Sequence, residues 1–149
     1  MKHLFNEVHH EEMKSRIMKL EPGIKAKWGK FNVPGMICHL VDVLEYMLGY
    51  KEGKKEIVPG PPMFIRSLVR LYIPFPKGKI QTAPDMLSRQ PGDFEKDLQR
   101  LIELFDEILT RKDKAQPWPI HPFFGELDGM QWAKLQWRHI NHHLTQFGV

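Results

Sequence analysis

The segment from residue 34 to residue 48 constrains the fold more than any other part of the chain, because apolar side chains occur almost all round the helix that it would form. Asn32 is a suitable N-cap for this helix, and Pro34 falls in the first turn, where proline is tolerated. Gly49 follows as a C-terminal stop. Since a helix without a polar face has to be covered on every side, the sequence predicts that residues 34–48 lie at the centre of the fold.

A second helix is predicted over residues 3–20. Its apolar residues fall near one face, Glu and Lys occupy most of the remaining positions, and Pro22 with Gly23 ends it. The residues assigned to the buried face are Leu4, Val8, Ile17 and Leu20.

Two further amphipathic helices are predicted in the second half of the chain. Asp93 is the N-cap of a helix that extends to about Lys112, and Asp128 is the N-cap of a helix over residues 129–146, which Gly148 follows. One packing stripe of the last helix has spacings of 4, 3, 4 and 3 residues and consists of Ala133, Trp137, Ile140, Leu144 and Phe147.

Residues 49–92 interrupt this helical pattern. Seven of the 12 prolines lie there, so long regular structure is not expected. The apolar piece over residues 63–73 is interpreted as a helix, and residues 74–79, a Pro- and Gly-containing run, are predicted to form the rim of a site. The chain is thus expected to be an all-α four-helix bundle with a Pro/Gly-rich excursion between its second and third helices, in a single domain over residues 1–149.

Composition excludes several classes of protein. The 22 basic residues are interspersed with 18 acidic ones, so no basic stripe predicts a nucleic-acid partner. No apolar stretch approaches the roughly 18–20 residues of a membrane span, and the polar N-terminus does not resemble a signal peptide, so we expect a cytoplasmic protein without membrane contact. The single cysteine, Cys38, rules out an internal disulfide and a cysteine-rich zinc site. No phosphate-binding glycine loop, dinucleotide fingerprint or nucleophile elbow occurs.

Histidines in the last predicted helix carry the main chemical signal. His139 and His143 are four residues apart, so both project from the same helical face and can bind one divalent metal ion. Nitrogen ligands suit zinc, nickel, iron or copper better than magnesium or calcium. The ordinary alternative is that two histidines share this spacing by chance. His142 lies about 100° from His143 around the helix, so the three cannot all bind one ion.

A metal site needs a third ligand, and His39 is the best candidate because it stands alone in the apolar central helix. The alternative is a core histidine that is only hydrogen-bonded. Asp42 can orient an imidazole or bind the metal through water, or can be an exposed residue. Cys38 is interpreted as a small buried hydrophobic residue rather than a ligand.

Several separated motifs occur in an order that resembles one family. They are Trp28-Gly29-Lys30, Met36-x-x-His39, Pro74-Phe75-Pro76-Lys77-Gly78-Lys79, Pro91-Gly92-Asp93-Phe94, His121-Pro122-Phe123-Phe124-Gly125, Trp132, Leu135, and His139-x-x-His142-His143-Leu144-x-Gln146-Phe147-Gly148. Together they resemble a subgroup of the DinB/YfiT-like superfamily that is labelled as a domain of unknown function. The resemblance covers residues 28–149.

The resemblance implies a DinB-like four-helix bundle that holds one divalent transition metal, zinc, nickel or iron. Carried over by motif position, the ligands are His39, His139 and His143, and His142 is not a ligand. Three protein ligands leave at least one coordination position open for water or substrate, as in catalytic zinc sites.

The superfamily also implies a chemistry. Its members include transferases and isomerases that use low-molecular-weight thiols such as bacillithiol or mycothiol, so the expected partners are such a thiol and a small electrophilic substrate. Lys77 and Lys79 can hold the carboxylates of the thiol, or can belong to an exposed loop without a ligand. His121 can donate a proton, or can be a loop histidine that is bonded to the backbone.

Three other readings stay open, and the sequence leaves undecided whether the chain is an enzyme. A non-catalytic module would have a closed metal site that stabilises the bundle. A plain helical interaction protein would use its histidines in ordinary roles. A metal-dependent hydrolase would need a carboxylate base, and the only candidates are Glu126 and Asp128. Asp128 is already explained as the N-cap of a helix. Because bundles with broad apolar helices often pair, a homodimer is also considered.

Overall fold

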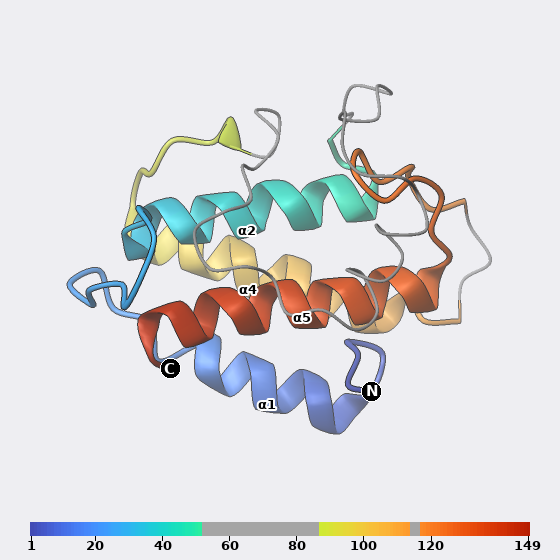
Figure 1. The fold of residues 1–149 in the computed structure, drawn as a ribbon, viewed down its shortest axis with the longest axis horizontal. Helices are drawn as coiled ribbons and strands as arrows, with labels where there is room; N and C mark the ends of the chain where they lie inside the picture. Colours follow the sequence, from blue (N-terminus) through green and yellow to red (C-terminus); the bar gives the residue numbers. More distant parts are fainter. Residues whose placement is uncertain (52–86, 114–116) are drawn as a thin grey trace.

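The computed structural model describes residues 1–51, 87–113 and 117–149, and these residues form an all-α four-helix bundle (Figure 1). The helices are α1 (Glu7–Ile17), α2 (Val33–Leu48), α4 (Phe94–Thr110) and α5 (Gly129–Phe147). The described residues contain no strand, and their only β-type pairing is an isolated bridge between His121 and Gly125. The predicted fold class is therefore confirmed.

The helices are arranged so that α2 and α1 lie at opposite corners of the bundle. Helix α2 packs against α4 and α5, and α1 packs against the same two helices from the other side (Figure 1). Side chains on α2 and α5 can consequently meet inside the bundle, although 80 residues (49–128) separate the two helices in the sequence.

The central position predicted for residues 34–48 is confirmed. Almost every side chain of α2 is buried. The side chain of Asn32 accepts a hydrogen bond from the Gly35 amide, and Gly49 ends the helix with φ of 80°. Because only glycine adopts a left-handed conformation without steric cost, this residue can stop the helix at that point.

Helix α1 is shorter than the predicted range of residues 3–20. It begins at Glu7 because the Asn6 side chain caps it through the His9 amide, while the Leu4 amide bonds to the Ala133 carbonyl on α5. Its buried face also differs from the prediction, because Val8 is exposed and His10 and Met13 are buried instead. The N-terminal residues are thus held by a tertiary contact, which sequence periodicity does not reveal.

Helix α5 begins with a capping box, in which the Asp128 side chain accepts from the Gln131 amide and the Gln131 side chain accepts from the Asp128 amide. The predicted packing stripe is buried except for Trp137, which is only partly buried. A second face is buried as well, because α5 has two neighbours, α1 and α2. This second face carries Trp132, Gln136 and His143.

The predicted helix over residues 63–73 and the predicted rim over residues 74–79 lie outside the described residues. Within the described part of the chain, no helix is both long enough and apolar enough to cross a membrane.

Candidate metal centre

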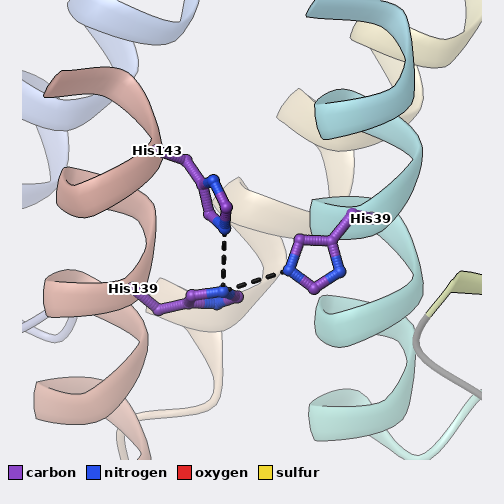
Figure 2. A group of neighbouring side chains, drawn as sticks. All are labelled: His39, His139 and His143. Carbon is purple, nitrogen blue, oxygen red and sulfur yellow. Dashed lines mark hydrogen bonds between the residues drawn. The ribbon is translucent and has the colours of Figure 1, made fainter. Parts of the chain in front are cut away.

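The structure brings together the three histidines that the sequence nominated as metal ligands. His39 projects from α2, and His139 and His143 project from consecutive turns of α5 into the space between the two helices (Figure 2). One ligand nitrogen from each side chain lies within 4.8 Å of the other two, so the three residues can hold a metal ion. His142 does not belong to this group, and its ring packs edge-on against Trp28 instead.

The distances between these nitrogens fit a single small cation. The Nε2 atom of His139 lies 3.1 Å from Nε2 of His39 and 3.1 Å from Nε2 of His143. Two nitrogens that are each about 2.0–2.1 Å from one tetrahedral zinc ion lie about 3.3–3.4 Å apart. The two nitrogen pairs that include His139 therefore already have nearly the spacing that a tetrahedral ion requires.

The surroundings of the triad are largely apolar. His39 and His143 are buried, whereas His139 keeps some accessible surface. Phe31 stacks on the His39 ring at 5.4 Å between centroids and meets the His143 ring edge-on at 5.6 Å. The aromatic ring of Phe31 covers one side of the site.

These surroundings keep the imidazoles of His139 and His143 uncharged. Burial, followed by the proximity of His39, lowers the pKa of His143 to about 3, although the hydrogen bond that its Nδ1–H donates to Gln146 acts in the opposite direction. The pKa of His139 is lowered well below its usual value, first by desolvation and then by the adjacent His143 and His39. Since a metal binds the neutral form of histidine, these two ligands do not have to release protons at pH 7 to accept an ion.

Two glutamines that the sequence reasoning left without a role contact the outer nitrogens of the triad. The Oε1 atom of Gln136 lies 3.3 Å from Nδ1 of His139, and Oε1 of Gln146 lies 3.0 Å from Nδ1 of His143. Both glutamines are buried. Their spacing of three residues from each histidine was visible in the sequence, but only burial distinguishes them from exposed helix glutamines.

Asp42 is buried, so the reading of it as an exposed residue is wrong. Its carboxylate accepts hydrogen bonds from Lys51 Nζ at 2.9 Å and from the Arg89 amide at 2.9 Å, and Ser88 Oγ lies 3.5 Å from each of its oxygens. None of these partners is an imidazole. Asp42 therefore links Lys51 to Ser88 and Arg89 through hydrogen bonds to its carboxylate.

Cys38 is buried, as expected for a small hydrophobic residue. Burial, followed by the nearby Asp97 carboxylate, raises the pKa of its thiol to about 11. A thiol with so high a pKa is a poor nucleophile, and Cys38 does not belong to the cluster of possible metal ligands.

The other residues that the sequence suggested for a site are Lys77, Lys79, Glu126, Asp128 and His121, and none of those that the structure describes belongs to the histidine cluster. Lys77 and Lys79 lie outside the described residues. Asp128 caps α5, and Glu126 is exposed. His121 is bonded to the backbone, because its Nδ1 accepts from the amides of Phe123 and Phe124. Its ring packs against Trp132 at 5.0 Å between centroids, so this histidine organises the loop before α5.

His121 is expected to make stability depend on pH. Burial lowers its pKa to about 3 in the folded chain, against about 6.5 in the unfolded chain. The unfolded state therefore binds a proton first, and stability is lost as pH falls from about 6.5 toward 3. At pH 5.5 the loss relative to pH 7.5 is about 1.4 kcal/mol for this group.

His121→Asn tests this expectation, because the Asn side-chain oxygen can take the place of Nδ1 as an acceptor without titrating. Urea unfolding at pH 7.5 and 5.5 should show that the wild type loses about 1.4 kcal/mol more than the variant. Equal losses in the two proteins would show that His121 is not held neutral by the fold.

Comparison with known proteins agrees with this architecture. A family model described as protein of unknown function (DUF1569) matches residues 7–148, which include all four helices and the three clustered histidines. No curated protein and no solved structure matches the chain significantly. The chain belongs to the DUF1569 family, which is part of the DinB-like superfamily.

Proposed function

We propose that the chain binds one divalent transition metal ion (zinc, nickel or iron) through His39, His139 and His143, and that this centre activates a low-molecular-weight thiol for transfer to a small electrophile. The observation that carries the proposal is the orientation of two imidazoles. The Nδ1 atoms of His139 and His143 face glutamine oxygens, so their Nε2 atoms present lone pairs to each other at 3.1 Å. A cation between the two nitrogens satisfies this contact, whereas two neutral acceptors repel each other.

The donor set also supports a transition metal. Three neutral imidazole nitrogens suit zinc, nickel or iron better than magnesium or calcium, which prefer oxygen. In the described part of the chain, no carboxylate or thiol joins the three histidines in the cluster. Three protein ligands leave a position for an external ligand, and this arrangement is typical of catalytic rather than structural zinc sites.

A bound divalent ion favours the thiolate form of a thiol, which is the nucleophilic form. The chain supplies the surroundings for that chemistry. Phe31 and the buried rings of His39 and His143 exclude water from one side of the site. In the transfer, the S–H proton is released to solvent, the sulfur lone pair forms the new carbon–sulfur bond, and the leaving group departs with its bonding electrons.

Cobalt substitution tests whether the centre is open to a thiol. Metal-free protein is loaded with one equivalent of Co²⁺ and titrated with L-cysteine while absorption is recorded. We expect a new near-ultraviolet sulfur-to-cobalt charge-transfer band and a change in the visible d–d bands. S-methyl-L-cysteine, which has no thiol proton to lose, is the matched control and should produce neither change.

The outcomes separate the competing functions. A cobalt spectrum that L-cysteine leaves unchanged would indicate a closed coordination sphere and favour a non-catalytic metal-binding bundle. Failure to bind Co²⁺, Zn²⁺, Ni²⁺ or Fe²⁺ would overturn the metal centre altogether and favour an interaction protein whose histidines have ordinary structural roles.

A further inference from the structure

The Nδ1 atoms of His139 and His143 each contact the side-chain carboxamide of a glutamine on the same helix, α5. Gln136 precedes His139 by three residues, and Gln146 follows His143 by three residues, so each pair lies on one helical face. The exposed fractions of the two glutamines are only 1% and 3%. A buried carboxamide has to satisfy both its oxygen and its NH₂ group, so its hydrogen bonds are decided by what surrounds it.

The orientation of the Gln146 carboxamide is set by the backbone of Trp28. Its Nε2 atom donates to the Trp28 carbonyl at 2.6 Å, and a carbonyl oxygen can only accept. Oε1 of Gln146 is therefore the atom that faces His143, at 3.0 Å from Nδ1. An oxygen acceptor requires a proton on Nδ1, which leaves the lone pair on Nε2, the atom that faces the triad.

Gly29 provides the space that this arrangement needs. It has φ of 79°, a left-handed conformation that favours glycine, and a Cβ atom at this position would lie 2.5 Å from Nε2 of Gln146. The same segment is attached to the end of α5 by a hydrogen bond from the Lys27 amide to the Gln146 carbonyl, at 2.8 Å. The loop before α2 and the last turn of α5 thus act together on one carboxamide.

We infer that Gln146 is a positioning residue that holds His143 in the Nδ1–H tautomer, and that Gln136 does the same for His139. The inference rests on the proposed function only for its effect on metal affinity, because the tautomer is a property of the metal-free chain. Partners of this kind typically contribute about 10–100-fold to metal affinity. A carboxamide orients the ring without adding the negative charge that a carboxylate would bring to the site.

Gln146→Met tests the inference, since methionine keeps the length and burial of the side chain but accepts no comparable hydrogen bond. Nitrogen-15 NMR of histidine-labelled, metal-free protein reports the tautomer of each ring. We expect the Nδ1–H form of His143 in the wild type, a mixture of tautomers in the variant, and no change at His139. Zinc affinity, measured by competition with a chromophoric chelator, should fall by about 10–100-fold.

Two controls separate positioning from a general loss of stability. Gln99→Met makes the same chemical change at an exposed glutamine of α4 and should alter neither the tautomer nor the zinc affinity. Gln136→Met should shift the tautomer of His139 and leave that of His143, which provides an independent test if Gln146→Met does not fold.

Gly29→Ala tests the proposed route through the loop. It should weaken zinc binding by displacing the Gln146 carboxamide. If both substitutions act through this carboxamide, the zinc affinity of the double variant Gly29→Ala/Gln146→Met should equal that of whichever single variant binds zinc less tightly. Additive losses would show that Gly29 acts by another route and would overturn that part of the inference.

The results distinguish this inference from the proposed function. An unchanged His143 tautomer in Gln146→Met would overturn the positioning role even if the wild type binds zinc. A shifted tautomer in a protein that binds no metal would support the positioning role and overturn the metal centre.

Discussion

Replacing His143 with alanine is expected to remove about one equivalent of transition metal from the protein, whereas replacing its neighbour His142 is expected to leave the metal in place. The reason is geometric, because the Nε2 atom of His143 lies in the cluster and the ring of His142 packs against Trp28 outside it. Structural zinc sites with four ligands bind with about 10–16 kcal/mol, or about 2.5–4 kcal/mol for each ligand. One lost ligand should therefore weaken binding about 10²–10³-fold.

Elemental analysis of purified, zinc-reconstituted and desalted protein measures this effect. His142→Ala is a closely matched control, because it removes the same side chain from the adjacent position of the same helix. His39→Ala, on α2, should abolish stoichiometric metal in the same way as His143→Ala. Circular dichroism of each metal-free variant establishes that the bundle is intact. Full metal retention in His143→Ala, or equal loss in His142→Ala, would exclude the proposed ligand set.

The second large effect concerns stability, and we expect Asp42→Asn to destabilise the fold by about 3 kcal/mol. The Asp42 side chain is 4% exposed and forms an ion pair with Lys51, whose side chain is 22% exposed. It also accepts from the Arg89 amide, and Ser88 contributes a long contact. The substitution removes the buried negative charge that faces Lys51 Nζ and points an NH₂ group at one of these donors.

Thermal unfolding should show the change as a decrease in Tm of about 6–12 °C, from the usual dependence for a chain of this size. Glu12→Gln is a suitable control, because it removes the solvent-exposed ion pair between Glu12 and Lys2, and it should leave Tm almost unchanged. A Tm of Asp42→Asn equal to that of the wild type would indicate that the contacts of Asp42 with Lys51 and Arg89 do not stabilise the native state.

Two of the buried histidines, on α1 and α2, show how far residue type alone can be interpreted. His10 and His39 are almost equally buried, at 1% and 2% exposed. The Nε2 atom of His10 lies 3.0 Å from the Phe105 carbonyl on α4, and its ring stacks on Phe105, so its role is structural. His39 instead faces two histidines of α5. The role of each histidine depends on which helix packs against it, and the residues next to it in the sequence do not predict which helix that is.

The sequence by itself determined the elements that depend on short-range physics. The apolar periodicity of α2, α4 and α5 and their caps at Asn32, Asp93 and Asp128 involve residues within one or two turns of each other, so the helices were predicted to within about two residues. The i, i+4 pair of His139 and His143 is equally local, and any α-helix places the two on one face.

Only the tertiary structure decided the contacts between distant segments. It determined that the Leu4 amide bonds to the Ala133 carbonyl on α5, and that Asp42 accepts from the backbone amide of Arg89. It also placed the Trp28 carbonyl where Gln146 can reach it. Such contacts depend on how the helices pack, and the free energy of packing is spread over many weak interactions between residues far apart in the chain. Such contacts therefore cannot be predicted from any local pattern of residues.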